Sequence, residues 1–420
     1  MSSSQTSKIG IGRNVAVKKS GRLDKSFFVN AFERLRERRQ TLRLEPEPAT
    51  FNRRWVSSIL QYFRDDSGGV TSVRFSSSGD RIAVGFNSGS LQVCKPILMD
   101  SRIGGEVLLE GWEGNHSISC VRFHPQRPEL LYASSTDGTI RRKDVNGNVK
   151  YEDVLITEKD NEIYSFDFDT AGTKMITGGR DAAIRVYDNT TKKLLTEYSR
   201  MMISETSLSS SGMSAGTENT QNHTKRIYCV RWLPEDSNIF VSGGWDCIVK
   251  VWDVRKPEGC VRNIEGPYIF GEAIDVCQGK VLTASCTASN TLALWDLGSG
   301  SLITDIVPTN KRVYLYGEFP YTAQFYRGDP SGDMVLYGGT GLGGLQVISI
   351  LEESIIYIFE DEKPVVSVDS TDTKIAFGGK SNTVLYGNLY AQEESMQIRL
   401  KIPSQDISES SLSTSNIVIE

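Results

Sequence analysis

The chain has 420 residues, 39% of them hydrophobic and 24% charged, with 38 glycines and a formal net charge of −5. This is the composition of a globular protein rich in turns, and 420 residues can bury a large core. Seven cysteines without a Cys-x-x-Cys pair, three histidines and no signal-like N-terminus argue against a disulfide framework and a histidine-rich metal site. We therefore expect an intracellular protein, cytoplasmic or nuclear.

The chain begins with a basic arm, which we place at residues 1–57. Residues 1–66 carry 14 Lys and Arg against 7 Asp and Glu, whereas the remainder is acidic. One amphipathic helix is predicted at about residues 24–41, because apolar residues recur at helical spacing among arginines. It either packs on the acidic remainder of the chain or binds a partner, and it lacks aromatic residues spaced to stack on bases. Its proposed partner-binding residues are Phe28, Phe32, Leu35, Arg36 and Arg39.

Residues 58–403 repeat one plan seven times: an apolar strand, a second strand ending in Gly or Ala, a tight turn and a third strand. Most intervals between repeats are 44 to 48 residues, and one of 64 holds an insertion. A period of this length matches one four-stranded blade. The first strands of the repeats are Val70–Phe75, Ile118–Phe123, Ile163–Phe168, Ile227–Trp232, Glu272–Val276, Tyr321–Phe325 and Val365–Asp369.

The third strands carry a Trp-Asp dipeptide, complete at Trp252-Asp253 and Trp295-Asp296 and degraded in two other repeats. We expect both tryptophans to be packing residues. An Asp stands six residues before the Trp position in three repeats. Such an Asp can accept hydrogen bonds from turn amides and so tie the second strand to the third. These structural turn residues are Asp137, Asp181 and Asp246.

The motif from Ser242 to Asp253, Ser-Gly-Gly-Trp-Asp-Cys-Ile-Val-Lys-Val-Trp-Asp, resembles the WD-repeat family of β-propellers. The resemblance implies an all-β fold, a seven-bladed β-propeller of four-stranded antiparallel blades around a central channel, preceded by the basic helical arm. The Gly-His dipeptide that usually opens a repeat survives only as Asn115-His116. The family tetrad of His, Asp, Ser or Thr, and Trp is therefore expected to be missing from most blades.

Two strands compete to close the last blade, because an open ring would expose a sheet edge. Ser58–Phe63 precedes the first inner strand, and Met396–Ile402 follows the last blade. We favour the N-terminal strand and expect the C-terminal one on the rim.

Three other segments need an explanation. Residues 199–224 are polar and read as a flexible insertion, either inert or a docking or phosphorylated loop; we attribute the glycosylation-like Asn222-His223-Thr224 to chance. The serine-rich tail at 404–420 is predicted to be disordered. The uncharged run 334–351 has five glycines in its middle and predicts a β-hairpin rather than a membrane span.

No phosphate-binding loop, nucleophile elbow or His-Glu-x-x-His motif occurs, so we expect neither an enzyme nor a bound cofactor or metal. In the family that the chain resembles, partners dock on the face where the turns between second and third strands gather. Trp245 and Arg180 there either bind a partner or are structural, covering the blade and bonding a neighbouring loop. The residues aligned at this position are Asn87, Thr136, Arg180, Trp245, Ala288, Gly341 and Lys380.

The sequence therefore predicts a scaffold that binds other proteins. The segment Trp252-Asp253-Val254-Arg255 resembles the box by which many propellers dock onto the cullin-4 ubiquitin ligase adaptor, which leaves a ligase substrate receptor as an alternative. A third alternative is RNA or ribosome-precursor binding through the basic residues 8–54. Neither a small-molecule ligand nor a membrane is expected as a partner.

Overall fold

The computed structural model describes residues 53–62, 67–99, 102–111, 115–146, 153–199, 221–256, 259–287, 291–310, 319–361, 363–381 and 383–391. The predicted helix at 24–41, most of the insertion at 199–224, the strand at 396–402 and the tail at 404–420 lie outside these residues. No helix in the described part of the chain is both long and apolar enough to span a membrane.

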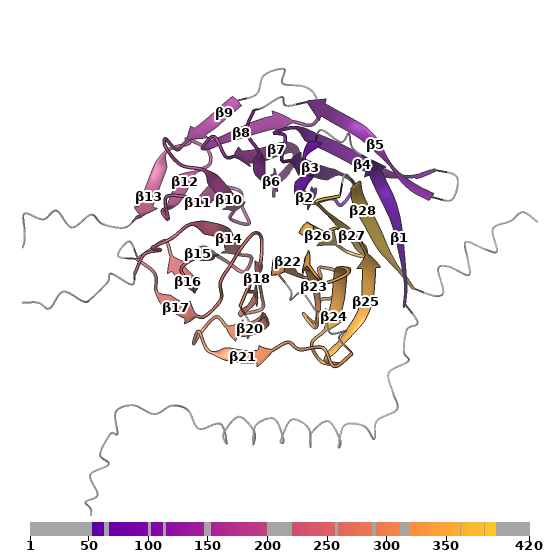
Figure 1. Ribbon diagram of the computed structural model, residues 1–420. Coiled ribbons are helices and arrows are strands. Elements are labelled where there is room, and N and C mark those ends of the chain that lie inside the picture. The colour runs from indigo at the N-terminus through magenta and orange to yellow at the C-terminus, as the bar shows by residue number, and fades with distance from the viewer. Residues whose placement is uncertain are drawn as a thin grey trace, which may run out of the picture. The chain divides into compact units, whose positions relative to one another are not determined.

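The described residues form seven four-stranded antiparallel sheets arranged as the blades of a propeller (Figure 1). The all-β, seven-bladed prediction is thus confirmed. Blade 1 contains β2 (Val70–Phe75), β3 (Ile82–Phe86), β4 (Leu91–Met99) and β5 (Arg102–Gly111), and blade 2 contains β6 (Ile118–His124), β7 (Arg127–Ser135), β8 (Thr139–Asp144) and β9 (Asp153–Thr157). Blade 3 contains β10 (Ile163–Phe168), β11 (Lys174–Gly179), β12 (Ile184–Asp188) and β13 (Leu194–Tyr198). Blade 4 contains β14 (Ile227–Leu233), β15 (Asp236–Gly244), β16 (Ile248–Asp253) and β17 (Arg262–Glu265).

The last three blades follow the same order from the channel outward. Blade 5 contains β18 (Ile274–Cys277), β19 (Lys280–Ala284), β20 (Leu292–Asp296) and β21 (Leu302–Asp305). Blade 6 contains β22 (Phe319–Phe325), β23 (Met334–Thr340), β24 (Gly344–Ser349) and β25 (Ser354–Glu360). Blade 7 contains β26 (Val365–Thr371), β27 (Lys374–Gly379) and β28 (Thr383–Ala391). The hairpin predicted within 334–351 is present as β23 and β24.

The seventh blade takes its outer strand from the other end of the repeat region. Strand β1 (Arg53–Tyr62) pairs antiparallel with β28, with Trp55 opposite Leu389 and Ile59 opposite Leu385. Figure 1 shows the indigo β1 beside the yellow β28. The preferred N-terminal closure is therefore confirmed, with a strand that begins five residues earlier than predicted.

The hydrophobic core lies between neighbouring blades, and glycines on the second strands bring those blades together. A Cβ atom on Gly85 of β3 would lie 2.6 Å from Cγ2 of Ile118, the first residue of the next inner strand. A real Cβ cannot approach another carbon so closely. The same close approach to the following blade occurs at Gly178, Gly243 and Gly338, and Gly378 lies almost as close, 3.1 Å from Val70 Cγ1. The glycine-rich composition thus reflects blade packing as well as turns.

Two of the three turn aspartates act as predicted. Asp137 Oδ1 accepts the Thr139 amide at 2.9 Å, and Asp181 Oδ1 accepts the Ala183 amide at 3.0 Å. Each carboxylate also pairs with an arginine four residues later, Arg141 at 3.0 Å and Arg185 at 2.6 Å. The third, Asp246, has different partners and belongs to a buried network described below.

Ring closure by β1 can be tested with two truncations. Deletion of residues 1–66 removes β1 and leaves the edge of β28 unpaired, so we expect aggregation and a lower melting temperature. Deletion of 1–52 retains β1 and is the matched control, expected to remain monomeric. Size-exclusion chromatography with light scattering and thermal unfolding measure both. A monomeric 67–420 chain that melts cooperatively near the full-length temperature would contradict closure by β1.

Candidate functional site

The predicted partner-binding residues occupy equivalent places at one mouth of the channel, which we call the turn face. In five blades the amide of this residue donates to the carbonyl just before the inner strand, at 3.0 to 3.1 Å. These residues are Asn87, Thr136, Arg180, Trp245 and Lys380. The structure therefore supports their alignment with one another; their binding role remains a prediction.

The alignment of Ala288 and Gly341 to this position is wrong. In blade 5 the equivalent residue is Cys286, which follows Thr283 by three residues as Trp245 follows Ser242; both hydroxyls accept the indole N–H of their blade's tryptophan. The Cys286 amide donates to the Tyr268 carbonyl at 3.0 Å. In blade 6 the equivalent residue is Thr340, which pairs with Phe319. The turns after these residues are two residues and one residue longer than the turn after Trp245, so counting back a fixed number of residues from the third strand stops short of the equivalent position.

An aromatic row crosses the turn face from blade 3 to blade 6. It consists of Tyr164, Tyr228, Trp245, Phe270 and Tyr321. Tyr164 and Tyr228 stack with centroids 4.7 Å apart, Tyr228 and Phe270 are 4.8 Å apart, and Phe270 and Tyr321 are 5.6 Å apart. Phe270 is 37% exposed and the other four rings are partly exposed. The sequence pointed only to Trp245, although tyrosine is the second residue of β10 and of β14 and the third residue of β22.

Arginines border the aromatic row. The guanidinium of Arg226 lies over the Trp245 ring, 5.2 Å from its centroid, and its Nη1 donates to the Tyr164 hydroxyl at 3.3 Å. Arg180, whose side chain is 54% exposed, pairs with Glu162 at 2.8 Å. Burial, followed by the hydrogen bond to Glu162, raises the pKa of Tyr164, so its phenol stays protonated at neutral pH. The row thus presents partly exposed rings beside two cations.

At the opposite mouth, one position of each inner strand places a polar side chain in the channel. In blade order these side chains belong to Arg74, Arg122, Asp167, Arg231, Asp275, Gln324 and Asp369. Each of the three aspartates accepts a backbone N–H from the following blade: Asp167 from Trp232 at 2.8 Å, Asp275 from Phe325 at 2.9 Å, and Asp369 from Phe75 at 2.8 Å. These carboxylates therefore join adjacent blades.

Glu272, which lies two residues before β18, joins the charged side chains of the channel. Its buried carboxylate accepts hydrogen bonds from Arg74 and, at 2.7 Å, from Arg122, and it lies 3.8 Å from Arg231. Ser367 donates to it at 3.3 Å. Burial alone would raise the pKa of Glu272, but the charges of Arg122 and Arg74 outweigh it and hold the pKa below its usual value. One carboxylate thus bridges blades 1, 2, 4, 5 and 7.

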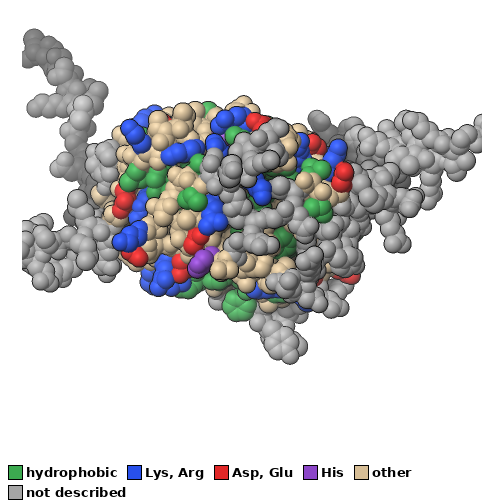
Figure 2. Space-filling model, turned by 90° about the horizontal axis from the view of Figure 1, so that it is seen from above, with side chains coloured by type: hydrophobic (Ala, Val, Ile, Leu, Met, Phe, Trp, Pro, Cys, Tyr) green, Lys and Arg blue, Asp and Glu red, His purple; other side chains and the backbone are tan. Residues whose placement is uncertain are grey.

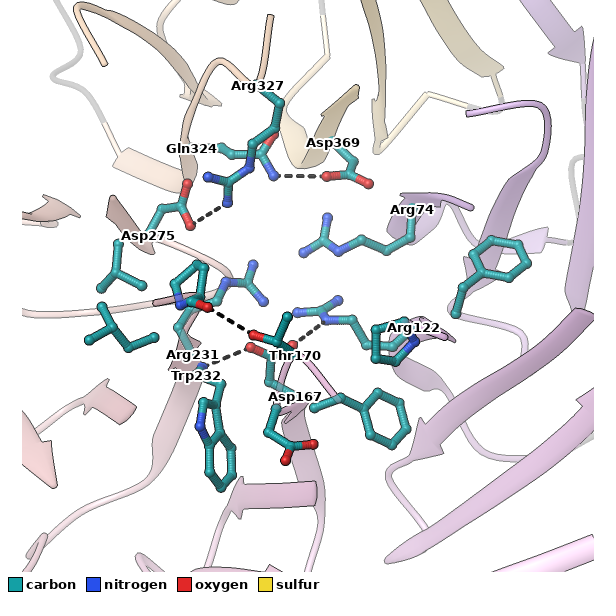
Figure 3. A pocket seen from close by; sticks show the side chains of 17 residues that line it. Arg74, Arg122, Asp167, Thr170, Arg231, Trp232, Asp275, Gln324, Arg327 and Asp369 are labelled. Carbon is teal, nitrogen blue, oxygen red and sulfur yellow. Dashed lines mark hydrogen bonds and ion pairs between the residues drawn. The ribbon is translucent and has the colours of Figure 1, made fainter. Parts of the chain in front are cut away.

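The channel opens at this mouth into a pocket of about 260 Å³ lined by the inner-strand ends and the turns that follow them (Figure 3). Four arginines and four aspartates line it. Arg122 pairs with Asp167 at 3.3 Å, and Arg327 pairs with Asp275 at 2.9 Å. Burial raises the pKa values of Asp167 and Asp275 although these arginines oppose it. None of the predicted partner-binding residues that the structure describes lines this pocket.

Blade 4 contains a buried tetrad built on His223. Its Nδ1 lies 2.7 Å from Asp246 Oδ2 and its Nε2 lies 2.7 Å from Ser242 Oγ. The indole N–H of Trp252 donates to the same Ser242 hydroxyl at 2.7 Å. The sequence predicts that the repeat opening survives only as Asn115-His116. The structure corrects this, because His223 is fully buried and opens the repeat of blade 4, whereas His116 is exposed.

Asp246, His223 and Ser242 follow the hydrogen-bond order of a serine hydrolase triad. However, both Ser242 and His223 are buried, and the serine oxygen also accepts the Trp252 indole N–H. A substrate carbonyl therefore has no path to this hydroxyl. In blade 3, Glu158 replaces the histidine and accepts hydrogen bonds from Thr177 at 2.6 Å and Tyr187 at 3.0 Å. The arrangement ties strands together in both blades.

The Trp-Asp-x-Arg box is part buried and part exposed. Trp252 is fully buried, and Trp295 of the next blade donates its indole N–H to Thr283 at 2.8 Å, so both tryptophans pack as predicted. The side chain of Arg255 is 61% exposed, and its guanidinium donates two hydrogen bonds to Asp253, from Nε to Oδ1 at 2.8 Å and from Nη2 to Oδ2 at 2.7 Å. This pairing, together with the Arg255 charge, lowers the pKa of Asp253.

The partner-helix residues Phe28, Phe32, Leu35, Arg36 and Arg39 lie outside the described residues.

The described residues include no group of three or more His, Cys, Asp or Glu side chains that could hold a metal ion. The cysteines at inner-strand positions are core residues, as predicted: Cys120 and Cys229 are fully buried. Burial raises the pKa of Cys120 to about 12, which keeps it a thiol.

Four segments of the chain match the model of the WD domain, G-beta repeat: residues 57–94, 107–141, 153–188 and 217–253. Cell division cycle 20.1, cofactor of APC complex, from Arabidopsis thaliana is 20% identical over 63% of this chain and 53% of that protein. Methylosome protein WDR77 from Xenopus laevis is 25% identical over 34% of this chain and 31% of that protein. Cross-pathway control WD-repeat protein 2 from Flammulina velutipes is 37% identical over 19% and 25%. The chain spans about half the length of the first of these relatives.

Replacing Glu272 with Gln tests its central role. The change leaves Arg74 and Arg122 buried without their shared counter-charge, so we expect the free energy of unfolding to fall by about 3–5 kcal/mol. Glu265→Gln is the control, since Glu265 is exposed. Denaturant titration measures both variants. Equal stability of the two would show that the channel charges do not hold the blades together.

His223 gives the fold a specific dependence on pH. Burial, with the Lys250 charge, lowers its pKa below the usual 6.5, although Asp246 opposes this shift. The unfolded chain therefore takes up a proton here before the folded chain does, and stability present above about pH 6.5 falls as the pH drops. We expect the unfolding free energy of the wild type to fall more between about pH 7 and pH 5 than that of His223→Gln. Parallel slopes would contradict a neutral buried imidazole, and His116→Gln is the exposed control.

Proposed function

The chain belongs to the WD-repeat family of β-propellers, and we propose that it is a non-enzymatic scaffold that assembles a multiprotein complex through the turn face and the basic arm. The observation that carries this proposal is the aromatic row beside Arg180 and Arg226. Other proteins are its partners, and we place it in the cytoplasm or the nucleus.

The aromatic row has the chemistry of a binding hot spot. Aromatic and arginine side chains dominate the energy of protein interfaces, because rigid rings bury a large area at low entropic cost. Five partly exposed rings spread over four blades give a partner a continuous apolar platform, with Arg180 and Arg226 at its border. By contrast, Figure 2 shows the rim with Lys and Arg among Asp and Glu, and with hydrophobic side chains in small patches.

The names of two relatives support an adaptor role. One is a cofactor of the APC complex and another is a methylosome protein, so both are named for assemblies of several components. The buried environments of Ser242, His223 and Cys120 support the non-enzymatic part of the proposal, since each reactive group is enclosed in the core.

The alternative of a cullin-type ligase receptor rests on Arg255, which is exposed at the end of β16. An adaptor that binds there must compete with Asp253, which already holds both edges of the guanidinium. The alternative of RNA or ribosome-precursor binding through residues 8–54 requires affinity that falls steeply with salt, and all of these residues except 53 and 54 lie outside the described residues.

Affinity capture from native extract tests the scaffold. The baits are the wild type, Trp245→Ala/Arg180→Ala and Arg255→Ala, each checked for an unchanged melting temperature. We expect the double variant to lose its specific partners, because it removes the central ring and an exposed cation of the turn face. Arg255→Ala, on the opposite mouth's side of the blade, should keep them. Partners retained by the double variant would place binding elsewhere, and loss of a ligase adaptor with Arg255→Ala would favour the ligase alternative.

A further inference from the structure

The pocket at the mouth opposite the turn face contains one arginine whose hydrogen-bonding capacity is unused. Among the described residues, the guanidinium of Arg231 makes a single ion pair, with Glu272 at 3.8 Å, and no hydrogen bond. Its side chain is only 11% exposed. In Figure 3 it points into the open centre of the pocket. A guanidinium carries five N–H donors, and leaving them without acceptors in a part-buried site is unfavourable.

The neighbouring arginines differ from Arg231 because each has close acceptors. Arg74 donates to the carbonyls of Val73 and Val368, both at 2.8 Å, and to Glu272. Arg122 donates to the Val121 carbonyl, Glu272 and Asp167. Glu272 is therefore already bound by two guanidinium groups and can offer Arg231 only a distant charge.

Unlike Arg231, the carboxylates of the pocket already have hydrogen-bond partners. Both oxygens of Asp167 accept hydrogen bonds, from Arg122 and from the Trp232 amide. The same is true of Asp275, with Arg327 and the Phe325 amide, and of Asp369, with Gln324 and the Phe75 amide. Asp169 is held by the Thr173 and Lys174 amides.

We propose that this pocket binds a single carboxylate group, the acidic side chain of a partner protein, through the guanidinium of Arg231. A planar carboxylate matches two parallel N–H donors of arginine. The pocket volume of about 260 Å³ accommodates such a side chain. Four fixed aspartates line the pocket, and they would repel a group with two negative charges more than a group with one. This site is separate from the turn face and adds a second contact at the other end of the channel.

The test uses the full chain and the blocked peptide acetyl-Gly-Glu-Gly-amide, with acetyl-Gly-Gln-Gly-amide as the uncharged match. Saturation-transfer NMR measures the dissociation constants. We expect the Glu peptide to bind at least about tenfold more tightly than the Gln peptide, and Arg231→Gln to remove this difference. Arg231→Lys, which keeps the charge but loses the fork, should retain part of it. Arg255→Gln is the matched control, an exposed arginine outside the pocket.

The outcomes separate the source of the carboxylate. If acetyl-Gly-Gly-Gly with a free C-terminus also binds through Arg231, the pocket accepts chain ends as well as acidic side chains. Equal binding of the Glu and Gln peptides, or binding unchanged by Arg231→Gln in a chain with a wild-type melting temperature, would overturn the proposal. Displacement of the Glu peptide by inorganic phosphate at lower concentration than by acetate would also overturn it, since the preferred anion would then carry more than one charge.

Discussion

The pairing of β1 with β28 is the constraint on which the rest of the molecule depends. Each blade packs on its neighbours through its two faces, and the pairing of β1 with β28 joins the start of the propeller to its last sheet and closes the ring of seven blades. Without this pairing the inner strands need not meet around a channel. The contact of Ser367 Oγ with the Val73 amide at 3.0 Å joins residues 294 positions apart, and it exists only in the closed ring.

Closure in turn creates an electrostatic problem, which Glu272 solves. Three arginines on different blades point into one narrow channel, and like charges at such distances repel strongly in a low dielectric. The negative charge of Glu272 offsets these positive charges. In Asp167, Asp275 and Asp369, one carboxylate oxygen accepts a backbone N–H of the following blade. The charged side chains that line the channel thus also form hydrogen bonds between blades. Arg231 is the member that this arrangement leaves with the fewest acceptors.

The sequence predicts the features that repeat, and it misses those that depend on the closed ring. The Trp-Asp strands, the 44- to 48-residue spacing and the turn residues Asp137 and Asp181 are local signals, and each predicted its structure correctly. Glu272 gave no signal, because its arginine partners lie 150 and 198 residues away. The tetrad of His223 was missed because this residue falls within the predicted insertion at 199–224, so the histidine appeared to belong to a polar loop instead of opening a repeat.

The inner strand explains how one scaffold holds two kinds of surface. Near its start a ring such as Tyr228 faces the turn face, and three residues later Arg231 faces the pocket at the other mouth. The residues between them, Cys229 and Val230, are fully buried and hold the blade in place. Because the two outward-facing positions make separate contacts, one can change without disturbing the other or the core. The same short strand therefore separates an aromatic mouth from one lined by charged side chains.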